Sequence, residues 1–240
     1  IMYVGTTTPV DVYGYYYDAG DWDGHNRHIG VPLDLMLLYD MKAGNFRDGD
    51  IANRFRLSSS SAWINEGTDG LPDILNEARW LLDFYKRAKA ALQTIGRGTG
   101  GVPGGRISGA EGLIGPDAGC ENRASWTDSR AAYINGEQTE NTYNYAAGAA
   151  YYAVCLQKFY KVTSNTEIDS WKNEAIAAYT WANGRSDNGA AGDAKMIAAA
   201  ALYRLTGTVS YQSDLSRLLA QDSKYPWYGN WQNPYGWQYA

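Results

Sequence analysis

Apolar residues recur at helical spacing along much of the chain. In the clearest stretch, residues 72–92, the apolar positions fall every three or four residues: Ile74, Leu75, Ala78, Leu81, Leu82 and Tyr85. Pro72 suits the first turn of such a helix, and acidic residues near its start and basic residues near its end suit the helix dipole. A shorter pattern predicts a helix over residues 29–41, with these residues on one side: Val31, Leu35, Leu38 and Tyr39.

The second half of the chain predicts four more helices. Their ranges are 142–161, 167–183, 193–206 and 211–220. The expected N-caps of the second and fourth are Thr166 and Ser210, and Gly184 and Gly207 mark the expected ends of the second and third. No stretch alternates clearly enough to predict a strand ladder. The pattern therefore predicts an all-α array, and paired helices with small residues at their contacts favour an α/α toroid or solenoid.

Loops fill the remainder, chiefly residues 1–28, 44–71 and 96–140. A connection as long as the last of these is more often functional than idle in a compact domain. The composition, with 45% hydrophobic and 20% charged residues, predicts a packed core. A net charge of −5 and the lack of any basic run argue against a nucleic-acid partner. No apolar run reaches membrane-spanning length.

The aromatic composition is biased, with 20 Tyr and 9 Trp but only 4 Phe. Tyr and Trp offer an apolar face with a polar edge, which suits the apolar C–H faces and hydroxyl rims of sugars. The alternative is that these rings fill the core of a helical protein. Cys120 and Cys155 are the only cysteines, and they could form one disulfide or remain free.

No Cys/His metal cluster is expected, because the chain has only two histidines besides these two cysteines. The first residues, "IMYVGTTTPV", lack the charged and then apolar regions of a signal peptide. They are more typical of the interior of a longer chain.

The stretch "YYDAGDWD" places two carboxylates, Asp18 and Asp21, three residues apart within an aromatic patch. Aspartates in such a stretch can cap turns and helix starts. Alternatively, two neighbouring carboxylates can hold and orient one water molecule. Like-charge repulsion between them would then raise one of their two pKa values. Spacing alone leaves both readings open.

The surrounding segment "VYGYYYDAGDWDGH" resembles the N-terminal signature of glycoside hydrolase family 9, the inverting cellulases. The family pattern there is a Gly-Gly-aromatic-Tyr-Asp-Ala-Gly-Asp run. This chain keeps the last five positions, and Tyr15 stands where the family usually has its second Gly. Similar stretches follow in the family's order across nearly all 240 residues: "GLPDILNEARWLLDF", "GGVPGGRI", "YNYAAGAAYYAVCLQKFY" and "GDAKMIAAAALYRLTG".

This resemblance implies an (α/α)6 barrel of twelve helices, of which about half is present, with residues 1–240 as the N-terminal part of the catalytic domain. It also implies that Asp21 is the general base and that Asp18 helps to hold the attacking water, with Ala19 and Gly20 leaving room. The family's general acid is a glutamate near the C-terminal end of the barrel and has no counterpart here. Glu137 and Glu140 have no supporting motif and are expected to be surface carboxylates.

Further site residues are weaker predictions. The substrate-binding candidates are Tyr17, Trp22, His25, Arg106 and Trp126. Trp22 and Trp126, like Trp231 and Trp237, could be sugar platforms or core residues. His25 and Arg106 could bond sugar hydroxyls or be exposed residues without a role. Asp193 matches a position that helps to bind calcium in some relatives, but the usual neighbouring Glu is Ala194 here. We therefore expect no required cofactor and no assigned metal site, with calcium as an optional ligand.

The function implied by the resemblance is inverting hydrolysis of β-1,4 bonds in cellulose or related β-glucans by a secreted enzyme. Its expected partners are the polysaccharide and the remaining half of the barrel from the same chain, with no nucleic acid and no membrane span. The alternative is a non-catalytic relative that binds glycans or displays them in a surface assembly. A third class, another (α/α)6 glycosidase or lyase, is disfavoured by the "YDAGD" run.

Overall fold

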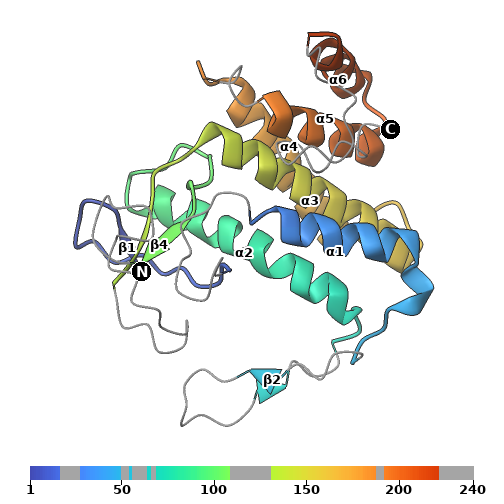
Figure 1. The fold of residues 1–240 in the computed structure, drawn as a ribbon, viewed down its shortest axis with the longest axis horizontal. Helices are drawn as coiled ribbons and strands as arrows, with labels where there is room; N and C mark the ends of the chain where they lie inside the picture. The colour runs from blue at the N-terminus through green and yellow to red at the C-terminus, as the bar shows by residue number, and fades with distance from the viewer. Residues whose placement is uncertain are drawn as a thin grey trace.

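Helices form most of the structure, a computed structural model that describes residues 1–16, 28–49, 54–55, 64–65, 69–108, 131–187 and 192–221. The helices are α1 (Gly30–Met41), α2 (Asp73–Thr94), α3 (Thr139–Tyr160), α4 (Thr166–Asn183), α5 (Gly192–Thr206) and α6 (Val209–Gln221) (Figure 1). A short 3₁₀ turn, η1 (Ala43–Asn45), follows α1. Every predicted helix is present close to its predicted bounds, which confirms the all-α class.

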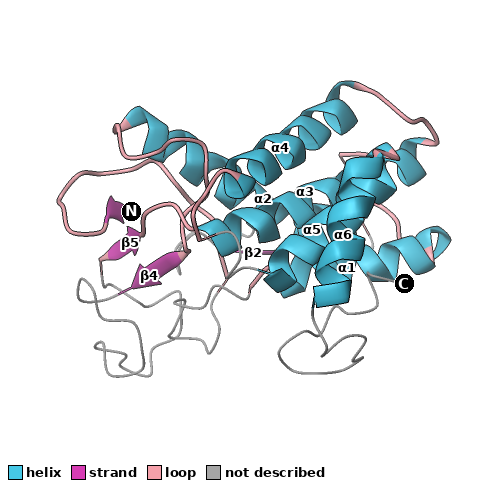
Figure 2. Cartoon of the chain, turned by 90° about the horizontal axis from the view of Figure 1, so that it is seen from above, coloured by secondary structure: helices cyan, strands magenta, loops and turns pink. Residues whose placement is uncertain are grey.

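The strands are short and correct the expectation of no strand pairing. β5 (Ala132–Ile134) pairs in parallel with β1 (Met2–Tyr3) and antiparallel with β4 (Arg106–Ser108), while β2 (Arg54–Phe55) pairs with β3 (Ile64–Asn65). Figure 2 shows β4 and β5 beside the helices rather than among them. Strands of two or three residues are too short to leave an alternating pattern in a sequence.

The central helix is α3, which is buried along most of its length and contacts α1, α2, α4 and α5. Its small residues allow this crowding. A Cβ atom added at Gly148 would lie 2.6 Å from Leu82 Cδ2 on α2, so only glycine fits there without movement. The predicted apolar stripe of α2 is buried as well, from Ile74 to Tyr85. The core therefore sits where α1, α2, α4 and α5 meet α3.

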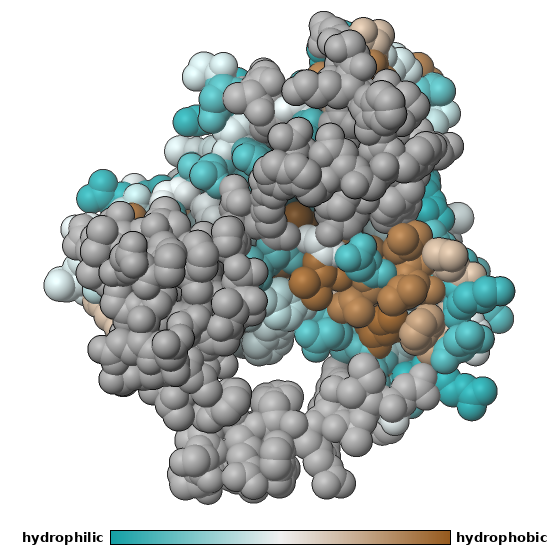
Figure 3. All heavy atoms as spheres, viewed as in Figure 1, coloured by the Kyte–Doolittle hydropathy of each residue, from teal (hydrophilic) through white to brown (hydrophobic). Residues whose placement is uncertain are grey.

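The side of α1 on which four apolar residues were predicted is mostly exposed. Tyr39 is buried, together with Leu33 and Met36, but Val31 and Leu38 are 43% and 51% exposed. They belong to an apolar stripe on α1, here called the α1 stripe, whose other members are the half-buried Leu35 and the exposed Met41. Figure 3 shows apolar side chains gathered over this helix. Because α1 is apolar nearly all round, its periodicity could not select the buried face.

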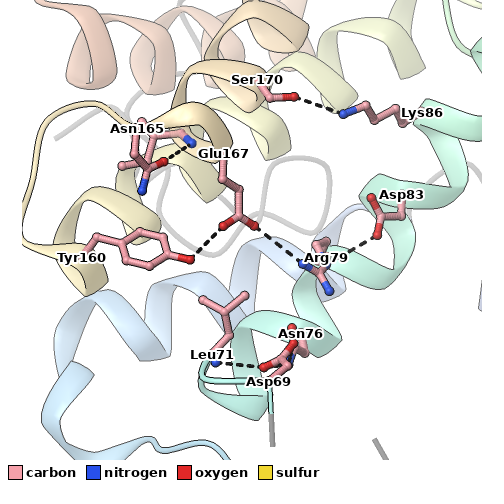
Figure 4. A network of polar contacts seen from close by, with 11 residues as sticks. Asp69, Leu71, Asn76, Arg79, Asp83, Lys86, Tyr160, Asn165, Glu167 and Ser170 are labelled. Carbon is pink, nitrogen blue, oxygen red and sulfur yellow. Dashed lines mark hydrogen bonds and ion pairs between the residues drawn. The ribbon is translucent and has the colours of Figure 1, made fainter.

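Polar contacts tie α2 to the corner between α3 and α4 (Figure 4). Arg79 on α2 lies 3.5 Å from Asp83 and 3.6 Å from Glu167 on α4. The Tyr160 hydroxyl donates to Glu167 Oε2 at 2.9 Å. Arg79, which belongs to the "GLPDILNEARWLLDF" stretch, therefore links α2 to α4.

Asn165 caps α4, since its side chain accepts a hydrogen bond from the Ile168 N–H at 2.8 Å. The predicted cap, Thr166, is instead the first residue of the helix. Gly207 follows α5 with a φ of 67°, as expected for a left-handed helix end, whereas Gly184 after α4 has a φ of −75°.

Asp40 near the end of α1 joins three helices. Its carboxylate lies 2.6 Å from Arg204 Nη2 on α5 and 3.0 Å from Lys158 Nζ on α3, and it accepts a hydrogen bond from the Tyr151 hydroxyl at 3.1 Å. Burial alone would raise the pKa of Asp40, but the hydrogen bonds from Lys158 and Arg204 outweigh burial and hold it below its ordinary value. The carboxylate is therefore charged at neutral pH.

Cys155 on α3 is a free, buried thiol, and burial raises its pKa. Cys120 lies outside the described residues. Within the described ranges, no helix combines the length and the apolar character needed to cross a membrane.

Candidate active site

Most predicted site residues fall outside the described part of the chain. This holds for Asp18 and Asp21, and also for Tyr17, Trp22, His25, Trp126, Trp231 and Trp237. Asp18 and Asp21 belong to residues 17–27, here called the aspartate segment. The described residues that flank this segment are Tyr16 before it and His28 after it. Of the predicted substrate contacts, Arg106 lies within the described part. The geometry of the two aspartates themselves stays a prediction.

The residues that flank the aspartate segment lie together. The rings of Tyr16 and His28 are nearly parallel, at 15°, with centroids 6.3 Å apart. The His28 ring also lies 4.8 Å from the ring of Tyr15. The chain therefore enters the segment and returns from it at one place in the fold.

Helix α2 fixes the chain just before the aspartate segment. The Tyr16 hydroxyl donates to two acceptors on Glu77: the backbone carbonyl oxygen at 3.0 Å and the side-chain Oε1 at 3.2 Å. Trp80 Nε1 donates to the Tyr15 carbonyl oxygen at 3.3 Å. Burial raises the pKa of Tyr16, and the neighbouring Glu77 carboxylate raises it further, so the phenol remains a neutral donor.

An exposed aromatic pair lies beside this anchor. Tyr13 is 58% exposed and Trp80 39% exposed, with ring centroids 6.4 Å apart. The Arg87 guanidinium lies 3.8 Å from the centre of the Tyr13 ring and donates to the Tyr13 carbonyl oxygen at 3.0 Å. These rings present apolar faces with polar edges next to the predicted catalytic segment, which suits contact with a sugar.

The glycine-rich loop, residues 99–105, meets the same anchor. A Cβ atom added at Gly105 would lie 2.6 Å from the Tyr15 hydroxyl, and Gly105 has a φ of 136°. The next residue, Arg106, is half-buried and begins β4, where it pairs with Ile134. The structure thus brings Arg106 near the start of the aspartate segment, although the two are far apart in the sequence.

Glu137 holds the glycine-rich loop. It is half-exposed, and its role in binding this loop was not predicted. Its Oε1 accepts from the N–H groups of Thr99, Gly100 and Gly101 at 2.6, 2.7 and 2.7 Å. Its Oε2 accepts from the Thr99 hydroxyl at 2.7 Å. Successive N–H groups that converge in this way form a nest for an anion. With both oxygens engaged, Glu137 is not placed to protonate a leaving group.

Trp181 at the end of α4 covers the other side of this loop. Its Nε1 donates to Thr99 Oγ1 at 2.8 Å, and a Cβ atom at Gly101 would lie 2.5 Å from its ring. The glycines therefore let the backbone approach both a carboxylate and an indole. By contrast, Glu140 is exposed on the first turn of α3, in line with its prediction.

Asp193, the residue weighed as a calcium ligand, is exposed in the first turn of α5, while Ala194 beside it is buried. Calcium binding at this position stays a prediction. Among the residues that the structure describes, no three His, Cys, Asp or Glu side chains are grouped to hold a metal ion.

Comparison with solved structures places the fold. No protein-family model matches the chain. A metagenome-derived glycoside hydrolase family 9 endoglucanase superposes with a TM-score of 0.69 over 99% of this chain, at 21% identity. The fold is that of glycoside hydrolase family 9. An endoglucanase of Alicyclobacillus acidocaldarius superposes with a TM-score of 0.68 over 99% of this chain, at 19% identity. An endoglucanase of the termite Nasutitermes takasagoensis superposes with a TM-score of 0.57 over 92% of this chain, at 18% identity.

The family 9 likeness covers only part of those proteins. The chain spans 42%, 43% and 47% of the three solved structures, respectively. In sequence, it is 36% identical over 78 residues to a cellulose 1,4-beta-cellobiosidase of Acetivibrio thermocellus, which is 32% of this chain and 8% of that protein. The predicted family resemblance and the partial (α/α)6 architecture are thereby confirmed.

Proposed function

We propose that residues 1–240 are the N-terminal part of a family 9 catalytic domain that hydrolyses β-1,4 bonds in cellulose or a related β-glucan. The observation that carries this proposal is the fold match over 99% of the chain to an endoglucanase, combined with the "YDAGD" run. The contacts among Tyr15, Tyr16, His28 and the glycine-rich loop, which involve the residues just before and just after the segment that holds that run, support it.

In the proposed reaction, Asp21 accepts a proton from a water molecule that Asp18 helps to orient. The water attacks the anomeric carbon from the face opposite the leaving group, so the configuration inverts. A carboxylic acid outside these 240 residues protonates the leaving oxygen. The proposed substrate contacts are Tyr17, Trp22, His25, Arg106 and Trp126. No cofactor is required, and calcium is optional.

The proposed partner of the chain is the remaining half of the barrel from the same polypeptide. Two observations support this. The matched solved structures are more than twice as long as the part this chain covers. The α1 stripe is exposed, and contiguous apolar surface on a soluble protein usually seeks a partner. Because an insoluble glucan polymer cannot enter a cell, we propose that the enzyme is secreted.

A second candidate is a non-catalytic protein that binds or displays glycans on this fold. One observation among the described residues is compatible with it: Glu137, which was weighed as a replacement acid, is engaged by the glycine-rich loop.

The two candidates separate in one experiment on the complete protein. Asp21→Asn should lower turnover of a soluble β-glucan roughly 10²–10⁴-fold while glucan binding persists, because only the activated water is lost. Asp11→Asn is the matched control, since Asp11 is an exposed aspartate nearby in the sequence. Normal turnover by Asp21→Asn would refute the role of Asp21. Binding without hydrolysis by the unaltered protein would favour the second candidate.

A further inference from the structure

Tyr15 adopts a backbone conformation that side chains rarely tolerate. Its φ is 90°, and among the described residues only one other non-glycine residue, Lys161, has a positive φ. Gly14 before it has a φ of 102°. A residue with a Cβ atom persists in such a conformation only where its surroundings over-determine it, and such residues concentrate at functional sites.

The Tyr15 side chain provides that determination through its contacts. It is 5% exposed, and its ring centroid lies 4.8 Å from Phe84 on α2 and 4.8 Å from His28. A third ring, Tyr85, packs nearly perpendicular to the Tyr15 ring, with the two ring centroids 6.3 Å apart. The Tyr15 side chain therefore joins the chain just before the aspartate segment to His28, the residue just after it, and to α2.

The hydroxyl end of Tyr15 extends the contact to the glycine-rich loop. It occupies the space that a Cβ atom at Gly105 would need, at 2.6 Å. Glu137 and Trp181 hold the same loop from its other end, through Thr99, Gly100 and Gly101. The loop is thus fixed at both ends, and Tyr15 is its link to the aspartate segment.

We propose that Tyr15 is a positioning residue that locks the two residues flanking the aspartate segment, Tyr16 and His28, and the glycine-rich loop into one unit. The consequence for catalysis rests on the proposed function. A general base must be aligned with its water and the anomeric carbon, and misplacement by about 1 Å can cost roughly 10²-fold in rate.

The first test is independent of activity. In the complete protein, Tyr15→Gly should raise amide hydrogen exchange in residues 100–106 about tenfold or more, because the loop loses its link. Ile168→Ala, a truncation of a fully buried residue on α4, is the matched control and should leave exchange in this loop unchanged. Unchanged exchange in Tyr15→Gly would overturn the lock.

The second test separates positioning from stability. Well below the melting temperature, Tyr15→Gly should lower kcat on soluble β-glucan about tenfold or more with little change in KM, whereas Ile168→Ala should not. Gly105→Ala should also lower kcat. Adding Tyr15→Phe should restore part of that loss, because the nearest remaining ring atom would then lie 3.3 Å from the new methyl group.

The outcomes distinguish this proposal from the proposed function. Raised exchange with an unchanged kcat in an active enzyme would overturn the positioning role. A complete protein that hydrolyses no glucan would overturn the proposed function instead. In that protein, raised exchange would still support the lock, and unchanged exchange would still overturn it.

Discussion

Replacing Glu137 with alanine should destabilise the fold more than its half-exposed position indicates. The carboxylate accepts three backbone N–H groups and one hydroxyl, all between 2.6 and 2.7 Å. Gly101 is buried, so its N–H group would lose its hydrogen-bond acceptor without gaining a water molecule. An unsatisfied buried donor of this kind lowers the free energy of unfolding by about 1–3 kcal/mol. The groups of the exposed Thr99 and the half-buried Gly100 can be rehydrated and contribute less. The expected loss is about 2–4 kcal/mol.

The assay is chemical denaturation of Glu137→Ala, Glu137→Gln and the matched control Glu140→Ala. Glu137→Gln should lose only about 1 kcal/mol, because its amide oxygen still accepts from the loop without the benefit of charge. Glu140→Ala should change the free energy of unfolding by less than about 0.5 kcal/mol, since Glu140 is exposed. Equal stabilities of Glu137→Ala and Glu140→Ala would refute the claim that this carboxylate holds the loop.

Three further predictions concern the helices. Because the pKa of Asp40 is held low in the folded state, its ionised form stabilises the fold above about pH 4. When the free energy of unfolding is measured by denaturation at a series of pH values, the difference between the unaltered protein and Asp40→Asn should shrink as the pH falls below about 4. A difference that stays constant with pH would contradict this. Gly148→Ala should destabilise by about 1–2 kcal/mol, because its methyl group meets α2 at 2.6 Å, whereas Gly44→Ala, with nothing within 4 Å, should not; equal melting temperatures would argue against this packing. The 240-residue chain expressed alone should self-associate through the α1 stripe, and Leu38→Lys should reduce that association in analytical ultracentrifugation; a monodisperse unaltered chain with a sharp melt would show that the stripe needs no partner.

Periodicity predicted the helices well because their buried faces repeat over many residues. The stripe from Ile74 to Tyr85 alternates with polar residues and defines both the helix and its buried side. Periodicity could not decide which side of α1 is buried, because Val31 and Leu38 are as apolar as Leu33 and Met36. Only packing against α2 and α3 decides between those faces. The strands were too short to leave any pattern.

The anchors around the site were not predictable from spacing. Glu137 accepts hydrogen bonds from residues that precede it by 36 to 38 positions in the sequence. A local sequence pattern cannot predict such a contact. The nearest signal was a run of glycines, whose N–H groups can converge on an anion. For Tyr15, the signal was its departure from the family's glycine, which marked a position where backbone conformation matters. The roles of Asp18 and Asp21 stay predictions from the resemblance.

The central claim is inverting hydrolysis of a β-glucan at the aspartate segment. The most direct measurement is a proton NMR time course of the complete protein acting on a soluble β-1,4-glucan. A water activated by Asp21 attacks from the face opposite the leaving group, so the first reducing ends released should carry the α configuration and then mutarotate. Initial release of the β anomer, or no release at all, would contradict the account.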